Sequence, residues 1–431
     1  MLDVNFIREN SNKVKEACEK KQTKVDVDKI LELDKQKRKL MTEMENLKAE
    51  QNKISRLGSP KPTGEGGGGF KNEPIIEQAK EIKGKIKEME PELERIENEL
   101  NPLLLQLPNI PFDDVPVGKN ESENVIMRQV GKKPKFSFTA KDYMQLGKDL
   151  DLIDTERAGK VAGSRFGYLK NELPLLEFAL INLVMDIARN LLAQSGEKFV
   201  PVIPPVMLKE EMARGTGYFE ATDEKEAYYL AEDKMFLAGT SEQPMVAMHA
   251  NEVLNEKDLP KRYVAFSTCF RREAGSYGKD TKGILRVHQF DKLEMVIFSK
   301  QEDSKKEHQL LLSIEEKLMK ALGLPYQVIN ICTGDLGRPA ACKYDIETWL
   351  PSENKYRETH STSNCTDFQA RRLNIRYKDK SGKMNFAHTL NGTAFAIGRI
   401  LIMIMENYQQ KDGSIRVPKA LQKYCGFKVI K

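Results

Sequence analysis

The sequence predicts an α+β protein, with a long helical hairpin near the N-terminus followed by a body of strands and helices. Three observations predict this fold class. Apolar residues across residues 30–103 step alternately by three and four, which is typical of packed helices. Residues 263–298 hold two strand-like runs joined by a loop rich in Gly, Ser, Lys and Asp, which indicates an antiparallel hairpin. Residues 304–322 then return to a helical pattern.

Length and composition set the limits for the rest of the chain. With 431 residues, 40% of them hydrophobic, it is long enough for two or more domains and a sizeable core. The net charge of +5 is mild, so binding to a polyanion would require a local basic patch. The first residues show no export signal, and no run is apolar and long enough to cross a bilayer. We therefore expect a cytoplasmic protein with no membrane association.

The N-terminal region carries two coiled-coil seams, in residues 30–54 and 75–103. Between them lies GSPKPTGEGGGG, residues 58–69, which no helix would cross and which turns the chain back. The seams predict an antiparallel hairpin whose helices, of about 33 residues each, would extend about 50 Å. Pro91 removes one backbone donor and predicts a kink in the second helix.

The function of such a hairpin is not fixed by its pattern, because projecting coiled coils more often serve dimerisation or spacing than RNA binding. Its first helix nevertheless carries basic residues that would contact phosphates and position an RNA without reading its bases. These residues are Lys35, Arg38, Lys39, Lys53 and Arg56. The Pro-rich, polar segment 105–125 is expected to be a linker, which gives a helical arm at 1–104 and a second domain at 126–431.

The hairpin at 263–298 is the best candidate for a functional site. Side chains alternate faces along a strand, so Arg271 and Glu273 share one face of the first strand. The same rule groups Arg286, His288, Phe290, Lys292 and Glu294 on the second strand, and it places Leu285 and Val287 on the opposite face. Guanidinium groups, an aromatic ring and carboxylates together suit a phosphate, a flat base and an ammonium. A ladder of salt bridges on a solvated sheet would have the same composition.

The string FRRE at 270–273, followed by HQF at 288–290 and by Glu294, resembles motif 2 of the class II aminoacyl-tRNA synthetases in the form found in seryl-tRNA synthetases. The resemblance implies that Arg271 is catalytic and contacts the α-phosphate of ATP and the serine carboxylate. It assigns the remaining ATP contacts to Arg272, to Glu273 at the adenine amino group, to Arg286 at the γ-phosphate and to Phe290 as the stacking ring. Glu294 would hold the serine ammonium. Arginine suits such a site because its planar fork binds oxyanions bidentately.

Two strings before this hairpin are similar to the same family. A helical pattern at 175–192 feeds the proline-ended strand FVPVIPP and resembles motif 1, which implies a homodimer. GTSE at 239–242 resembles the Thr-x-Glu position of the serine site and implies serine contacts for Thr240, Ser241 and Glu242. Without the resemblance, this string would be an ordinary helix N-cap.

Two strings after the hairpin complete the resemblance. ETHS at 358–361 resembles the Glu-x-x-Ser segment, which implies ATP contacts from Glu358, Thr359, His360 and Ser361. Glu358 and Ser361 would hold Mg²⁺, which prefers oxygen ligands, and His360, which stands where Ser or Thr is usual, would be a supporting donor. HTLNGTAFAIGRILIMIMENYQQ at 388–410 resembles motif 3. There Thr393 would bond the serine hydroxyl, and Arg399, at a helix start, would be catalytic and meet the γ-phosphate.

Across the whole chain, the resemblance implies a class II antiparallel sheet flanked by helices and an arm that lies along tRNA. The implied activity is that of a seryl-tRNA synthetase, which uses ATP and Mg²⁺ to activate L-serine and transfers it to tRNA(Ser), with tRNA(Sec) as a second acceptor. Two alternatives share parts of this pattern. An aminoacyl ligase that charges a carrier protein would lack the long arm, and a non-catalytic RNA-binding paralogue would have lost motif residues. The arm is present and no expected Arg or Glu is missing, which favours the synthetase.

Overall fold

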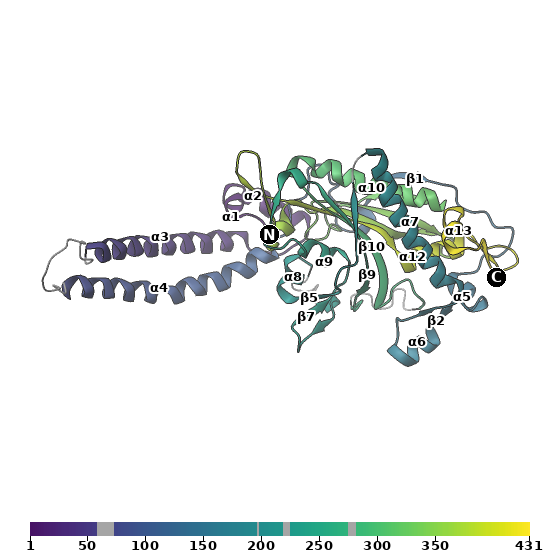
Figure 1. Ribbon diagram of the computed structural model, residues 1–431, viewed down its shortest axis with the longest axis horizontal. Coiled ribbons are helices and arrows are strands. Elements are labelled where there is room, and N and C mark those ends of the chain that lie inside the picture. The colour runs from purple at the N-terminus through teal and green to yellow at the C-terminus, as the bar shows by residue number, and fades with distance from the viewer. Residues whose placement is uncertain (58–72, 196–197, 219–224, 275–281) are drawn as a thin grey trace, which may run out of the picture. The chain divides into compact units, whose positions relative to one another are not determined.

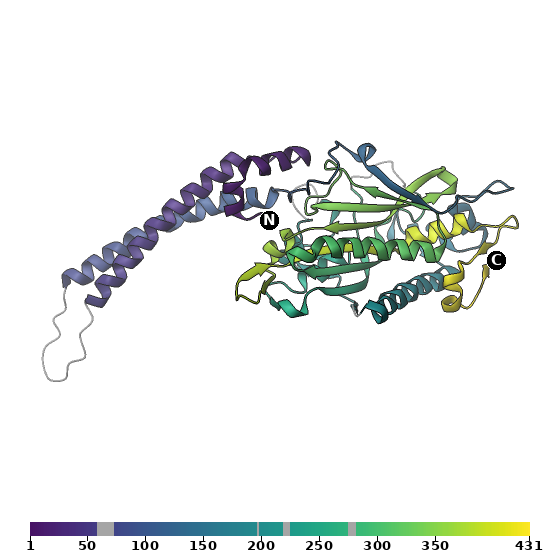
Figure 2. The same ribbon diagram turned by 90° about the horizontal axis from the view of Figure 1, so that it is seen from above.

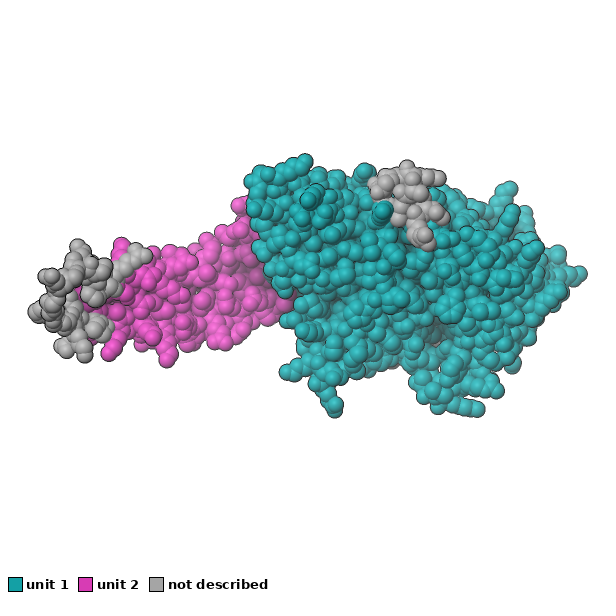
Figure 3. Space-filling view, viewed as in Figure 1, with its two compact units in different colours: residues 1, 19–22, 108–431 teal, residues 2–18, 23–107 magenta. Residues whose placement is uncertain are grey.

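The computed structural model describes residues 1–57, 73–195, 198–218, 225–274 and 282–431. The Gly-rich turn expected at 58–69 and most of the loop of the 263–298 hairpin lie outside these residues. The chain forms two compact units, coloured separately in Figure 3. One unit comprises residues 2–18 and 23–107, and the other comprises residues 1, 19–22 and 108–431.

The first unit is entirely helical (Figure 1). Its elements are α1 (Val4–Glu9), α2 (Ser11–Lys20), α3 (Val27–Leu57) and α4 (Glu73–Gln106). The long helices α3 and α4 pack through apolar residues of the predicted seams, among them Met44, Ile54, Ile82 and Ile86. The predicted helical hairpin is confirmed, and α4 continues through Pro91 as one helix.

The second unit is built on an eight-stranded sheet with the order β1-β11-β12-β13-β16-β10-β9-β4. These strands are β1 (Val125–Val130), β4 (Phe199–Val202), β9 (Lys261–Phe270), β10 (Gln289–Ser299), β11 (Tyr326–Asn330), β12 (Cys342–Leu350), β13 (Lys355–Asn364) and β16 (His388–Ala396). β4 pairs in parallel with β9, and the other neighbours are antiparallel. The predicted α+β class and the antiparallel sheet are confirmed.

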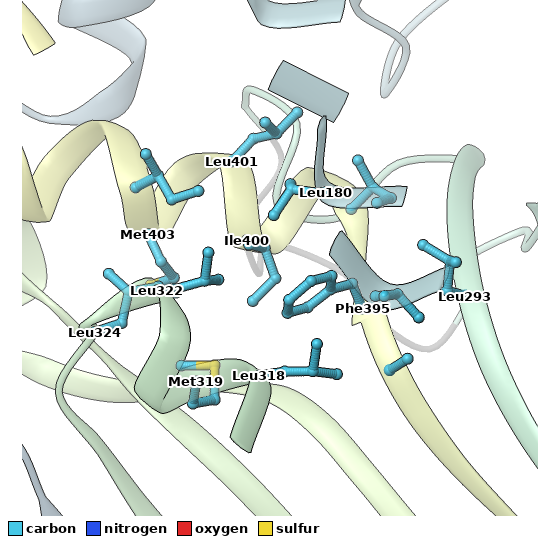
Figure 4. Packing of buried hydrophobic residues seen from close by; sticks show 14 of the residues in the cluster. Leu180, Leu293, Leu318, Met319, Leu322, Leu324, Phe395, Ile400, Leu401 and Met403 are labelled. Atoms are coloured by element: carbon cyan, nitrogen blue, oxygen red, sulfur yellow. The ribbon is translucent and has the colours of Figure 1, made fainter. Parts of the chain in front are cut away.

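Three helices cover one face of this sheet: α7 (Glu172–Ser195), α10 (Ser304–Leu322) and α12 (Ile397–Asn407). Their apolar residues meet those of the strands, and Figure 4 shows Phe395 of β16 between Leu318 of α10 and Ile400 of α12. Figure 2 shows α10 running along the sheet. On β10, Leu293 and Met295 join this core while Glu294, between them, lines the pocket described below. The opposite face carries the polar side chains around Glu294 and, farther along β10, a second apolar cluster that includes Val296 and Phe298.

Shorter elements surround the sheet. The helices are α5 (Tyr143–Asp149), α6 (Thr155–Ala162), α8 (Glu210–Gly215), α9 (Glu242–Ala247), α11 (Phe368–Leu373) and α13 (Lys419–Cys425). Small sheets are formed by β2 (Ile153–Asp154) with β3 (Tyr168–Leu169), by β5 (Met207–Lys209), β6 (Tyr229–Leu230) and β7 (Met235–Leu237), by β8 (Val253–Asn255), β14 (Arg376–Lys378) and β15 (Met384–Phe386), and by β17 (Ile415–Arg416) with β18 (Val429–Ile430). Among the described residues, no helix has the length and apolarity needed to cross a membrane.

A β-bulge interrupts the pairing of β12 with β13. Ile346 pairs with His360 and Glu347 pairs with Glu358, so Thr359 is an extra residue on β13. A regular strand turns residues three apart to opposite faces. The bulge reverses this parity and places Glu358 and Ser361 on the same side of the sheet.

Candidate active site

A cavity of about 610 Å³ opens on the face of the sheet that carries Glu294. It is lined by side chains from β9, β10, β12, β13 and β16, from the start of α12, and from loops beside them. The structure brings together in it most of the residues that the sequence singled out. These are Thr240, Glu242, Arg271, Glu273, Arg286, Phe290, Glu294, Glu358, Thr359, Ser361, Thr393 and Arg399.

One end of the cavity carries an aromatic ring and arginines. The guanidinium of Arg271 lies 5.3 Å from the centre of the Phe290 ring, and its Nε donates to the carbonyl of Gly239 at 2.9 Å. Arg286 Nη1 lies 3.4 Å from Glu273 Oε2, so this carboxylate is held at the cavity wall. A cationic group next to a ring and a carboxylate is suited to a nucleotide, whose base stacks and whose phosphates need positive charge.

The strand alternation expected around this end is partly wrong. Leu285 and Val287 are buried in the same core cluster as Leu293 and Met295, as expected, although both also border the cavity. β10 itself begins only at Gln289. His288, expected to face the cavity, instead places its Nδ1 3.0 Å from the carbonyl of Arg271.

Three predicted site residues direct their side chains elsewhere. Arg272 donates to the carbonyl of Ala227 at 2.8 Å instead of facing the cavity. The Ser241 hydroxyl lies 2.8 Å from that of Ser267, because Ser241 sits between two residues that do face the cavity. Arg272 and Ser241 could therefore contact a ligand through their backbone, or act by supporting neighbouring residues that line the cavity.

His360 is the third of these residues. Neighbouring residues of a strand point to opposite faces, and Ser361 takes the cavity side. The His360 ring packs at 5.7 Å from that of Phe395, with its Nδ1 2.9 Å from Thr359 Oγ1. Burial lowers the pKa of His360 to about 3, so this ring is neutral.

At the other end of the cavity, Glu294 is only 1% exposed. Its carboxylate lies 2.6 Å from the Lys292 ammonium and accepts from Thr393 Oγ1 at 3.3 Å. The same ammonium donates to Thr240 Oγ1 at 2.9 Å. Burial raises the pKa of Glu294 above its ordinary value, and the Lys292 charge opposes that rise.

Glu242 is a second buried carboxylate at this end. It accepts hydrogen bonds from the Tyr218 hydroxyl, from Gln369 Nε2 and from Asn391 Nδ2, each at 2.9 Å. Burial and then the nearby charge of Glu294 raise the pKa of Glu242 to about 7. Two buried carboxylates and hydroxyl groups at one end of a cavity suit a small ligand with an ammonium and a hydroxyl.

The middle of the cavity contains the Glu358 and Ser361 oxygens that the bulge places on one side of β13. Arg399 Nη1 donates to the Glu358 carbonyl at 2.9 Å and lies 3.4 Å from its carboxylate. Burial would raise the pKa of Glu358, but the surrounding cations, Arg399 first, bring it to about 2. Asp345 pairs with Ser361 across the strands, and its buried Oδ1 has no hydrogen-bond partner among the described residues. Carboxylate and hydroxyl oxygens with spare capacity fit Mg²⁺.

Several cavity residues were not assigned a role from the sequence. Lys292 lies on the face already singled out for β10, but nothing in the pattern showed that it would bridge Glu294 and Thr240. Asn391 is two residues before Thr393, so strand alternation would have found it. Tyr218 comes from a loop and Lys343 from a different strand, and no spacing links them to the motifs.

The basic residues proposed for RNA contact all belong to α3. Lys35, Arg38, Lys39 and Lys53 are exposed, while the side chain of Arg56 lies outside the described ones. Arg38 Nε donates to Asp34 at 2.9 Å, which leaves the rest of its guanidinium at the surface.

Comparison with known proteins extends over the whole chain. Residues 1–111 match the family of the seryl-tRNA synthetase N-terminal domain, and residues 227–408 match the class II tRNA synthetase core domain that serves G, H, P, S and T. A serine–tRNA ligase of Dictyoglomus turgidum is 45% identical over all of this chain and 99% of its own length. One of Treponema denticola is 43% identical over 99% of both chains. A crystal structure of seryl-tRNA synthetase from Pyrococcus horikoshii complexed with ATP superposes with a TM-score of 0.87 at 41% identity, covering 100% of this chain and 99% of the other.

Proposed function

The chain belongs to the seryl-tRNA synthetase family, and on that basis we propose that it activates L-serine with ATP and transfers it to tRNA(Ser). One structural observation supports the proposal independently of the family relationship. A single cavity has a ring and arginines at one end and two buried carboxylates with hydroxyl groups at the other. The first end suits ATP and the second suits serine, so the carboxylate of serine and the α-phosphate would meet between them.

The reaction follows from the placement of charge. The adenine would stack on Phe290 beside Glu273, with the phosphates directed at Arg271, Arg286 and Arg399. Glu294 and Glu242 would hold the serine ammonium, and Thr393 its hydroxyl. A serine carboxylate oxygen then attacks the α-phosphorus, the bond to the β-phosphate oxygen breaks, and pyrophosphate leaves. Arg271 neutralises charge on the attacking carboxylate and on the phosphoryl oxygens, and fixing both reactants in line removes much of the entropic barrier.

The oxygen set of Glu358 and Ser361 would hold Mg²⁺, with Asp345 behind them. When bound, the ion supplies positive charge to the phosphates. The chain's own residues would orient the phosphates. Arg399 Nη1 donates to the Glu358 carbonyl at 2.9 Å, so its guanidinium lies next to the place where the phosphates would be.

In the second step a hydroxyl of the terminal ribose of tRNA attacks the carbonyl carbon of seryl-adenylate. An ester bond forms, the bond to phosphate breaks, and AMP leaves with the hydroxyl proton passing to its phosphate or to water. We propose that residues 1–104 bind the tRNA, with tRNA(Sec) as a second acceptor, that 105–125 are a linker, and that 126–431 catalyse the reaction. The exposed lysines and arginines of α3 would contact phosphates.

We also propose a homodimer formed through α7 and β4. Large apolar side chains are exposed there, with Phe178 60% and Ile203 83% exposed, and Leu175 and Val200 beside them in sequence are half exposed. Apolar side chains gathered at a surface in this way mark an interface more often than free surface. A cytoplasmic location follows from the proposed reaction, since tRNA, ATP and serine meet there.

Exchange of labelled pyrophosphate into ATP, measured with each amino acid in turn, tests the proposal directly. We expect serine to support exchange and charging of tRNA(Ser). Exchange without tRNA charging, but with transfer to a carrier protein, would identify the carrier-charging ligase instead. No exchange with any amino acid would identify the non-catalytic RNA-binding paralogue.

A further inference from the structure

A short stretch of backbone, residues 337–341, forms one wall of the cavity through Gly337, Pro339 and Ala340. None of its residues belongs to a sequence motif. It approaches the serine end, because a β-carbon at Gly217 would lie 3.8 Å from the Pro339 β-carbon, and the next residue, Tyr218, bonds Glu242.

The carbonyl oxygens of this wall are all held by residues that precede α3 or follow α4 in the sequence. The Lys21 ammonium donates to the carbonyls of Gly337, Arg338 and Ala340 at 2.9, 3.1 and 2.7 Å. Lys21 precedes α3 and is only 8% exposed. An ammonium has three donor hydrogens, so these three acceptors use all of them.

Asn109, which follows α4, holds the same wall from a second position. Its Nδ2 donates to the carbonyls of Pro339 and Cys365, both at 2.8 Å, and its backbone N–H donates to Arg338. The Phe112 N–H donates to the carbonyl of Ala341 at 2.9 Å. Five successive carbonyls are therefore fixed by residues 21, 109 and 112.

The bonds of Asn109 also lead toward the serine carboxylates. The Cys365 sulfur, whose carbonyl Asn109 holds, lies 3.8 Å from Asn391 Nδ2. Asn391 Nδ2 in turn donates to Glu242 at 2.9 Å. Lys21 and Asn109 lie in the same compact unit as the cavity, although residues 1–111 match a separate N-terminal domain.

We propose that Lys21 and Asn109 are positioning residues for serine activation, acting by holding the wall 337–341 against the serine end of the cavity. The inference rests on the proposed function, and it assigns to the N-terminal region a part in the first half-reaction in addition to tRNA binding. Without the Lys21 ammonium, the buried Ala340 carbonyl would lose the side-chain donor that holds it, and the Gly337 and Arg338 carbonyls would each lose one of two donors, so the wall would rearrange.

The test is pyrophosphate exchange by the full-length protein with Lys21→Met, which keeps the length of the side chain and removes its donors. Lys15→Met is the matched control, because Lys15 is a partly exposed residue of α2 that pairs with Asp28. We expect Lys21→Met to raise the KM for serine about tenfold or more, since a lost donor to buried groups has effects of that size, while the KM for ATP changes less than about twofold. Lys15→Met should leave both values unchanged.

Asn109→Asp provides a second variant that keeps the shape of the side chain and replaces its amide donors with acceptors, and we expect the same selective rise in the KM for serine. Misfolded molecules lower kcat without altering KM, so incomplete folding does not obscure the result. A serine KM within about twofold of wild type in both variants, or an equal rise in both KM values, would overturn the inference. A wild-type protein without serine-dependent exchange would overturn the proposed function itself.

Discussion

Replacing Glu294 with Gln tests the serine end most sharply. The substitution keeps the shape of the side chain and removes the charge that faces Lys292 at 2.6 Å. A buried charge pair that loses one member costs about 2–4 kcal/mol, which corresponds to a fall in kcat/KM for serine of roughly 30- to 900-fold. The loss falls on serine, because the nucleotide contacts come from other residues.

The second carboxylate makes the size of this effect depend on pH. The pKa of Glu242 is raised to about 7, so its negative charge is present above that pH and is lost as the pH falls through it. In the Glu294→Gln variant only Glu242 remains to bind the serine ammonium. Because the charge of Glu294 helps to raise that pKa, its removal should bring the Glu242 pKa below about 7, so the pH below which kcat/KM for serine falls should lie lower than in the wild type.

The assay is serine-dependent pyrophosphate exchange at pH 6, 7 and 8, with Glu307→Gln as the matched control. Glu307 is another buried carboxylate, paired with Arg262 at 2.7 Å, and it does not line the cavity. The control should lower the melting temperature without changing the KM for serine. Near-normal exchange by Glu294→Gln, or a loss equal to that of the control, would refute the assignment.

Five further predictions come from the same structure. Threonine should be the leading misactivated analogue and alanine should lag behind, because an unmet bond to Thr393 is rejected more strongly than an extra methyl group; exchange rates with alanine above those with threonine would contradict this pocket. Replacing residues 26–103 with a short Gly/Ser linker should leave pyrophosphate exchange nearly intact and abolish tRNA charging. The slope of the logarithm of tRNA affinity against the logarithm of salt concentration should fall by about one unit per lost phosphate contact. An inactive monomer in size-exclusion chromatography would contradict this prediction. Glu358→Gln should raise the Mg²⁺ concentration that gives half-maximal exchange, and an unchanged requirement would remove Glu358 from the metal site. Gly392→Ala should lower the melting temperature, because its β-carbon would lie 3.0 Å from Glu315 Oε1. Burial raises the pKa of Glu315, so the stability of the wild type is lost as the pH rises above about 4.5. Glu315→Gln should therefore raise the free energy of unfolding at pH 8 by about 1–3 kcal/mol, which urea unfolding at pH 5 and 8 measures.

The helical hairpin and the strands were predictable because their signals are local. Periods of 3.5 and 2 residues follow directly from backbone geometry, and the seams of α3 and α4 formed where the apolar residues recur. Alternation failed at His288, whose ring turns to the carbonyl of Arg271, because the strand starts later, at Gln289. The start of a strand depends on the partner with which it pairs, and that partner is distant in the sequence.

The candidate site divides in the same way. Arg271 and Glu273 of the string FRRE line the cavity, whereas Arg272 between them donates to the carbonyl of Ala227. Lys292 was visible on the right face of β10, but its bond to Thr240 joins residues 52 positions apart. Lys21 and its bonds to residues more than 300 positions away left no pattern at all.

The bulge at Thr359 makes the spacing of the metal-side residues depend on one inserted position. If the bulge were lost while Thr359 stayed in the chain, so that every residue of β13 paired in turn, the strand beyond it would shift by one place relative to β12. The Ser361 hydroxyl, or the Glu358 carboxylate, would then turn toward the apolar core and Phe395. Deletion of Thr359 would instead keep both side chains on the cavity side, because Glu358 and Ser361 would then be two residues apart in a regular strand.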